Sequence, residues 1–191
     1  MIRICLLTLV FLFSLSLGVG AQETPGEEEN ITNTPSATTE DLKEQIIEIQ
    51  NQGKFGIRHF IPCSKIQAIG VYTELTEPKF KQEETAYFYI EPENFFTRKS
   101  EGKYEIWISE DILILSERGE TLMEKLGVVE THYNSASHIL DVYFNNHVEF
   151  KGVPAGKYIF KVILYDKIKN TSASEVLPFE VLEVTPPQKQ E

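Results

Sequence analysis

The sequence predicts an all-β domain, an antiparallel sandwich of two sheets with about seven to nine strands. From Phe55 onward the apolar runs are short, rich in Ile, Val, Tyr and Phe, and separated by Gly, Pro, Asn and Asp. Alternation is clearest over 157–164, where four apolar residues face one way while Lys157 and Lys161 face the other. No helical pattern separates these runs, which favours a sandwich over an α/β fold.

The same alternation places the strands and the turns between them. Glu117-Arg118-Gly119-Glu120 and the stretch 166–170 are predicted hairpin turns. Pro92 is expected to break strand pairing, because proline has no backbone N–H to donate. Candidate strands lie near 56–61, 65–74, 85–91, 103–109, 111–116, 121–131, 138–145, 157–166 and 174–184.

The N-terminal region predicts export. One basic residue, Arg3, precedes an apolar run from Ile4 to Leu17, and small residues follow up to Ala21, so 1–21 is interpreted as a cleaved signal peptide. The run is short for a bilayer-spanning helix, which needs about 20 apolar residues. Residues 22–37, acidic and rich in Thr and Pro, are a predicted disordered spacer. The mature protein is therefore expected in the periplasm or outside the cell, with no membrane insertion after cleavage.

A short amphipathic helix is predicted over 38–53. Acidic residues stand in its first turn, and Leu42, Ile46 and Ile49 recur at i, i+4 and i+7 to form one apolar stripe that ends before Gly53. Two roles stay open for this stripe: it packs on the domain behind it, or it docks a partner. The sandwich is predicted to fill 54–184, and 185–191 is expected to be a loose tail.

Charge and cysteine content restrict the partners and the chemistry. Without Arg3 the chain carries 17 basic and 29 acidic residues, a net charge of −12. This balance disfavours nucleic acid and anionic lipid, which bind basic patches. Signal cleavage also removes Cys5, so Cys63 is the one cysteine left and an internal disulfide is excluded. Cys63 follows Ile61-Pro62 beside a strand and is interpreted as a buried, unreactive residue.

Two groups of short motifs carry a resemblance to a known family. The early group is Cys63-Ser64-Lys65-Ile66, Ile69-Gly70-Val71-Tyr72 and Tyr89-Ile90-Glu91-Pro92-Glu93-Asn94-Phe95. The late group is Val153-Pro154-Ala155-Gly156-Lys157-Tyr158 and, after Asp166, Leu177-Pro178-Phe179-Glu180-Val181. The early group resembles a family of exported hypothetical proteins common in planctomycete-type bacteria, and the late group is similar to the ending found in many bacterial immunoglobulin-like domains. Together the resemblance covers about residues 55–184. The resemblance implies an immunoglobulin-like β-sandwich and carries no activity over.

Tyr158 is predicted to be structural. Pro154 and Gly156 form a turn that stops one strand, and Tyr158 starts the next. Its ring can be buried while its hydroxyl caps a nearby backbone group, as in the tyrosine corner of such sandwiches.

Residues capable of chemistry are scattered along the chain. His59, His132, His138 and His147 show no metal-ligand spacing, although His132 and His138 can meet across a hairpin. The acidic pairs Glu91/Glu93, Glu83/Glu84 and Glu110/Asp111 are expected on solvated faces. We predict no catalytic residue, no metal site and no cofactor.

Aromatic residues are candidates for a binding platform. Trp107 alternates with Tyr104, Ile106 and Ile108, so it faces the opposite side of its strand. Either Trp107 fills the core between the sheets, or it is exposed and marks a binding surface. The core position is the more common one for a tryptophan in an immunoglobulin-like sandwich.

These observations favour a non-catalytic exported module, binding or structural, that acts on a protein or cell-envelope partner. One alternative is a protease-inhibitor-like sandwich that uses loops near 92–103 and 131–137. A second alternative is a hydrolase, which is supported only by Cys63 and the scattered Glu and His residues. The sequence predicts neither the identity of the partner nor the oligomeric state.

Overall fold

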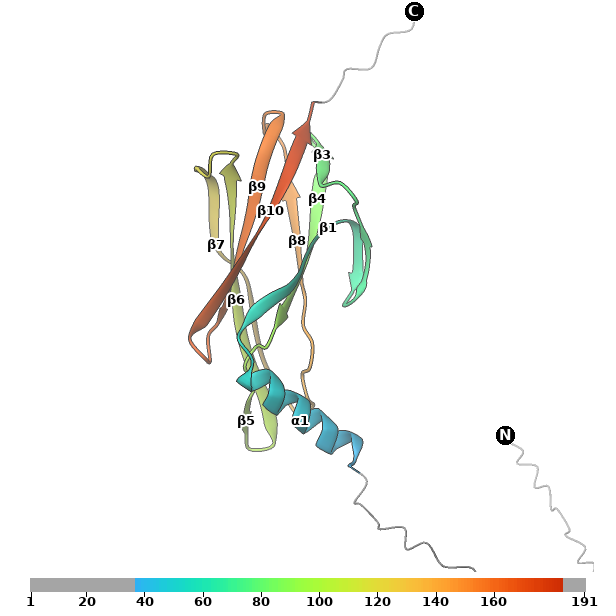
Figure 1. Cartoon of the computed structure of the whole chain (residues 1–191), viewed down its shortest axis with the longest axis vertical. Coiled ribbons are helices and arrows are strands. Elements are labelled where there is room, and N and C mark those ends of the chain that lie inside the picture. Colours follow the sequence, from blue (N-terminus) through green and yellow to red (C-terminus); the bar gives the residue numbers. More distant parts are fainter. Residues whose placement is uncertain (1–36, 184–191) are drawn as a thin grey trace, which may run out of the picture. The chain divides into compact units, whose positions relative to one another are not determined.

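The computed structural model describes residues 37–183, which form a β-sandwich with one helix at one end (Figure 1). The helix, α1, spans Thr39–Gln52. One sheet has four strands in the order β2-β1-β4-β8. Their bounds are β1 Gly56–Ala68, β2 Val71–Glu74, β4 Thr85–Glu93 and β8 Phe144–Glu149. All three pairings within this sheet are antiparallel.

The other sheet has six strands in the order β3-β10-β9-β6-β5, with β7 paired to the free side of β6. Strand β3 pairs with β10 in parallel, and the other pairs described in this sheet are antiparallel. The bounds are β3 Lys79–Lys81, β5 Arg98–Ser100, β6 Lys103–Ser116, β7 Thr121–Ser135, β9 Gly156–Asp166 and β10 Thr171–Leu182. Strands β7 and β8 therefore form edges of the two sheets.

Two apolar clusters fill the space between the sheets. One is built of packed aromatic rings, among them Phe88 and Phe160 with ring centroids 4.4 Å apart. The other lies nearer to α1 and includes Ile106, Ile108 and Val162. Strand β6 supplies both clusters, because every second side chain from 104 to 114 points inward and is buried.

The predicted β-sandwich is confirmed, and several strand assignments need correction. The structure has ten strands within residues 37–183, and two of them, β3 and β5, each three residues long, were not among the nine predicted. The stretches 103–109 and 111–116 form one continuous strand, β6. The stretch 65–74 contains a turn between β1 and β2, and 138–145 is mostly irregular, since β8 begins at Phe144. The ends of these strands could not be predicted, because the apolar runs there are short and show no clear alternation.

The two predicted hairpin turns are present. Ser116 and Glu120 close the β6–β7 turn through a backbone hydrogen bond of 2.8 Å. In the β9–β10 turn, Asp166 accepts hydrogen bonds from the backbone N–H groups of Ile168 and Lys169. Carboxylates commonly stabilise turns in this way, by bonding to backbone two or three residues further on.

Pro92 does not break the pairing of β4 with β1, where it lies opposite Ile57. Pairing with β8 on the other side of β4 ends at Ile90, two residues earlier. Pairing with β1 therefore continues past Pro92 to Glu93 with an irregular register between Ile57 and His59, and the expected break is seen on the β8 side alone.

Tyr158 and Cys63 have the structural roles that were predicted. The Tyr158 hydroxyl donates to the carbonyl of Pro154 at 2.8 Å, and its ring stacks on Phe179. Cys63 is buried, and burial raises the pKa of its thiol to about 11, which leaves the thiol protonated and poorly nucleophilic.

The helix predicted over 38–53 is observed with Thr38 as its N-cap and Gly53 as its C-cap. Across residues 37–183, no helix combines the length and apolar character required to cross a membrane. The predicted signal peptide 1–21, the spacer 22–37 apart from Ala37, and the tail 185–191 lie outside the described residues.

Candidate functional site: the α1 surface

Helix α1 begins at a capping box. The side chain of Thr38 accepts a hydrogen bond from the backbone N–H of Asp41, and the Asp41 carboxylate accepts one from the backbone N–H of Thr38. The two contacts satisfy donors that the first helical turn leaves free. The helix is 14 residues long, and a helix of that length is marginal in water without tertiary contacts. What holds it on the domain therefore decides its role.

The apolar stripe of α1 is left largely uncovered by the sandwich. Leu42, Ile46 and Ile49 are 49%, 46% and 70% exposed, whereas Ile47 on the opposite side is 4% exposed. Packing of the stripe on the domain, one of the two predicted roles, is therefore wrong. An amphipathic surface helix normally buries its stripe, so this orientation is inverted. We call the stripe and the hollow beside it the α1 surface.

Amide side chains hold the C-terminal half of α1. Asn51 exchanges two hydrogen bonds with the backbone of Thr97: its Nδ2 donates to the carbonyl at 2.9 Å, and its Oδ1 accepts from the N–H at 2.8 Å. Gln50 Nε2 donates to the carbonyl of Phe95 at 2.9 Å. The helix thus supplies hydrogen-bond partners to backbone groups of residues 94–97, the segment between β4 and β5 that belongs to no strand.

Charged groups hold the N-terminal half. The carboxylate of Glu44 accepts hydrogen bonds from Lys99 and from the hydroxyl of Tyr104, and it lies 3.3 Å from Nε2 of His138. Hydrogen bonds from Lys99 and Tyr104 lower the pKa of Glu44 to about 2, so this carboxylate is ionised at physiological pH. His138 also approaches Glu40, with 3.2 Å between Nδ1 and the carboxylate.

A lysine from the β9–β10 turn closes the helix C-terminus. Lys169 Nζ donates to the carbonyls of Asn51 at 2.9 Å and Gly53 at 3.2 Å. The last turn of α1 contains no basic residue of its own. Lys169 therefore provides the positive charge that the carbonyl end of a helix favours.

A hollow of about 240 Å³ adjoins the stripe. Ile46 and Ile49 form its helical wall, and the opposite wall includes Leu140. Its charged lining is Arg58, Glu93 and Asp141. The complete lining is Ile46, Ile49, Gln50, Arg58, Pro92, Glu93, Asn94, Phe95, Leu140 and Asp141.

The border of the α1 surface is acidic in effect. Its two basic side chains are already engaged: Lys43 pairs with Glu40 at 2.8 Å, and Arg58 pairs with both Glu91 at 2.6 Å and Asp141 at 3.3 Å. Glu48 on the helix is exposed. An apolar stripe with such a border attracts a partner that carries both apolar and basic groups.

Arg58 belongs to a polar cluster on the outer face of the four-stranded sheet. Its guanidinium donates two hydrogen bonds to Glu91, which also accepts one from the Tyr89 hydroxyl and contacts Nδ1 of His59 at 2.9 Å. The turn between β1 and β2 covers the cluster, since the N–H of Gly70 donates to the Tyr89 hydroxyl at 2.8 Å. Burial raises the pKa of Glu91, but the hydrogen bonds outweigh burial and lower it overall.

The other sequence candidates are dispersed. His132 stacks on Trp107 and contacts Glu105, whereas His138 lies against α1. Within residues 37–183, no cluster of three or more His, Cys, Asp or Glu side chains is arranged to bind a metal ion. Glu91 and Glu110 are buried, so the expectation that their acidic pairs lie on solvated faces is wrong for these two residues.

Trp107 does not fill the core. Tyr104, Ile106 and Ile108 occupy the inward positions of β6, and Trp107 is half-buried on the outer face of the six-stranded sheet. Its indole N–H donates to Glu130 at 2.6 Å. The hydrogen bond to Glu130 and the stacking of His132 already engage the indole ring, so less of its surface is free to contact a ligand.

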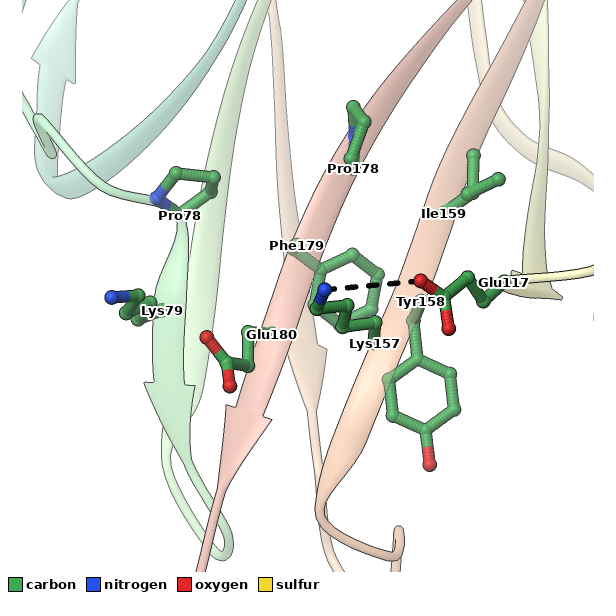
Figure 2. Close-up of a pocket in the computed structure, with 9 residues that line it drawn as sticks. All are labelled: Pro78, Lys79, Glu117, Lys157, Tyr158, Ile159, Pro178, Phe179 and Glu180. Carbon is green, nitrogen blue, oxygen red and sulfur yellow. Dashed lines mark ion pairs between the residues drawn. The ribbon is translucent and has the colours of Figure 1, made fainter.

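A second hollow, of about 480 Å³, lies where β3, β10 and β9 run side by side (Figure 2). Its rim includes Lys157 and Glu117, whose charged atoms are 3.8 Å apart. Both side chains are exposed, and exposed pairs of this kind contribute less than about 1 kcal/mol. The lining is Pro78, Lys79, Glu117, Lys157, Tyr158, Ile159, Pro178, Phe179 and Glu180.

The amphipathic pattern of α1 was found from the sequence, but its inversion was not. Periodicity shows that a stripe exists and cannot show which side faces the domain. One signal was present: the side opposite the stripe carries Glu40, Glu44 and Asn51, residues that hydrogen-bond well to backbone and charged groups. The contacting segment around Thr97 comes from residues too irregular to be placed by pattern.

Comparison with known proteins shows similarity of fold alone. No known protein family matches this chain, and no curated protein does. A Niemann-Pick type C2 protein from Japanese carpenter ant is 6% identical, with 68% of this chain and 94% of that chain covered and a TM-score of 0.42. The CARDB domain of a Pyrococcus furiosus protein, in complex with di-metal ions, is 8% identical over 68% and 86%, with a TM-score of 0.32. The PmoD soluble domain from Methylocystis is 12% identical over 66% and 90%, also at 0.32.

Proposed function

We propose that this protein is a non-catalytic, exported binding module that captures a protein partner through the α1 surface. The observation that carries the proposal is the inverted helix. Hydrogen bonds and ion pairs fix α1 to the sandwich, and Leu42, Ile46 and Ile49 are left in solvent. Exposed apolar patches bordered by polar residues are typical of interaction sites.

The chemistry of the partner follows from the surface. A segment with apolar side chains at helical spacing can lie along the stripe and place one side chain in the hollow beside Ile46 and Ile49. Basic residues on that segment would meet Glu48 and Glu93. We therefore propose a basic, amphipathic protein segment rather than a nucleic acid or an anionic lipid as the partner.

The structure gives no specific support to the two alternatives. Of the proposed inhibitor loops, 92–103 is held under α1 through Phe95 and Thr97, and most of 131–137 belongs to strand β7. The exposed part of 92–103 is the short hairpin of β5 and β6, whose two-residue turn is Glu101-Gly102 (Figure 1). For the hydrolase, the Cys63 thiol is buried with a raised pKa.

Affinity capture from the envelope fraction of the host tests the proposal. The bait protein carries either Ile46→Asp with Ile49→Asp, or the control pair Leu126→Asp with Val176→Asp. All four side chains are at least 46% exposed, so both variants keep the fold. A protein enriched by the wild type and the control, and lost with the helix variant, supports the proposal. Equal enrichment by both variants would contradict it.

A further inference from the structure

A third hollow opens between the two sheets at the end of the sandwich remote from α1. Its volume is about 590 Å³, and residues of β6, β7, β8, β9 and β10 line it together with the connection between β8 and β9. Strands β7 and β8 are edge strands, so no further strand of residues 37–183 covers the opening. We call this hollow the intersheet pocket. Its lining is Ile114, Ser116, Leu122, Met123, Val148, Glu149, Phe150, Gly152, Val153, Pro154, Gly156, Lys157, Tyr158 and Phe179.

The floor of the intersheet pocket is the aromatic core cluster itself. Ile114, Val148, Phe150 and Phe179 belong to that cluster and also line the pocket. The hollow therefore runs from solvent to the packed interior. Small-molecule sites in proteins are typically concave, mainly apolar and about 300–1,000 Å³ in volume.

The side-chain hydroxyls of the wall and one of its carbonyls are already used within the chain. The Tyr158 hydroxyl donates to Pro154, and the Ser116 hydroxyl accepts from the backbone N–H groups of Arg118 and Glu120. The carbonyl of Val153 accepts from the side-chain amide of Gln82. A polar ligand would lose its hydration and find few free side-chain partners on the floor and wall, which costs free energy.

Charge at the rim does not favour an ionic ligand either. Lys157 and Glu149 carry opposite charges and both line the pocket. Lys157 is also shared with the hollow of Figure 2, where it faces Glu117. The two charges oppose each other in their effect on an anion or a cation.

We propose that the intersheet pocket binds a neutral, apolar small molecule. The molecule lies on the aromatic floor, and the thioether side chain of Met123 at the wall adapts to its shape. This site is separate from the α1 surface and shares none of its residues. A failure of ligand binding at this pocket would therefore not affect the proposed protein partner, and the reverse also holds.

Fluorescence titration of the purified protein with N-phenyl-1-naphthylamine, a neutral apolar dye, tests the proposal. We expect saturable binding with a Kd of about 10 μM, typical of a small ligand held by apolar contacts. Leu122→Asp places a charge at the pocket, and Val153→Trp fills it. Each is expected to weaken the dye affinity at least about tenfold.

Leu126→Asp is the matched control. Leu122 and Leu126 lie on the same strand and are 56% and 70% exposed, but only Leu122 lines the pocket. The control and the helix variant Ile46→Asp with Ile49→Asp should bind the dye as the wild type does. No saturable binding to the wild type would overturn the proposal. Equal affinity of Leu122→Asp, Val153→Trp and Leu126→Asp would overturn it as well, because the dye would then bind elsewhere.

Discussion

Glu91 and Glu110 are both buried, at 4% and 0% exposure, but their surroundings are opposite. Glu91, on the outer face of the four-stranded sheet, accepts hydrogen bonds from Arg58 and Tyr89 and contacts His59. Glu110 points into the core from β6, and Asn146 is its one hydrogen-bond donor among residues 37–183. Its second oxygen, Oε2, has no partner among these residues.

The difference shows that burial alone does not determine the charge of a carboxyl group. Both groups lose water, which raises the pKa. At Glu91 the surrounding donors reverse this effect and the pKa falls below its usual value. At Glu110 burial prevails over the single Asn146 bond, and the pKa rises to about 7. One carboxyl is thus held ionised, and the other is about half protonated near pH 7.

The largest effect is expected from Glu91→Ala. Removal of the carboxylate leaves the Arg58 guanidinium and the Tyr89 hydroxyl without their shared acceptor, so the free energy of unfolding should fall by about 3 kcal/mol. Urea unfolding at pH 7 measures the change. Glu93→Ala, at an exposed position on the same strand, serves as the control and should cost less than about 0.5 kcal/mol. If the two variants lost the same stability, the cluster would not stabilise the fold.

Glu110→Gln should have the opposite effect, and the effect should depend on pH. The pKa of Glu110 is raised in the folded state, so its contribution to stability is fully present below about pH 4.5 and is lost as pH rises through 7. The rise in pKa from 4.5 to about 7 corresponds to about 3 kcal/mol of unfolding free energy. The uncharged variant should therefore be about 2 kcal/mol more stable than the wild type at pH 8, since the buried amide retains part of the desolvation cost.

Unfolding curves of Glu110→Gln and of the wild type at pH 5 and pH 8 provide the measurement. The gain should be small at pH 5, where the wild-type carboxyl is protonated in the folded protein. A surface variant, Glu117→Gln, should show no such difference between the two pH values. A gain that is the same at both pH values would mean that ionisation of Glu110 is not the cause.

The burial of Glu110 follows from the alternation of buried residues along β6, if that alternation is continued past residue 109. Alternation along 103–109 correctly predicted that Tyr104, Ile106 and Ile108 share one face. The prediction of two strands, 103–109 and 111–116, places residue 110 between them. In the structure the inward-facing alternation continues through Glu110 to Ile114. A glutamate between apolar runs looks like a strand end, because ionised carboxylates are seldom buried.

The α1 surface shows a second limit of sequence analysis. The helix, the acidic residues of its first turn and its apolar stripe were all predicted, because each depends on neighbouring residues. The direction of the stripe depends on contacts made by Thr97, Lys99 and Lys169, which are 46 or more residues away from their helical partners. Long-range hydrogen bonds of this kind leave no periodic signal in a single sequence.

The smallest effect is expected at Glu44, which resembles Glu91 in its chemistry but lies at the surface. Its pKa is lowered to about 2, so its contribution to helix docking is present above about pH 4.5 and is lost as pH falls toward 2. Solvent screens this site, so whole-protein stability should change little. Amide hydrogen exchange of α1, corrected for intrinsic rates, should instead show lower protection in Glu44→Gln than in the wild type at pH 7.

Helix exchange rates at lower pH separate docking by Glu44 from the general stability of the helix. Wild-type protection should fall toward that of Glu44→Gln as pH decreases below 4.5, because protonation removes the same charge that the variant removes. Glu48→Gln is the matched control, since Glu48 lies on the same helix and is exposed. If Glu48→Gln lowered protection as much as Glu44→Gln, the cause would be helix propensity rather than contact with Lys99 and Tyr104. The inverted helix would then depend mainly on the amide contacts of Gln50 and Asn51, which do not titrate.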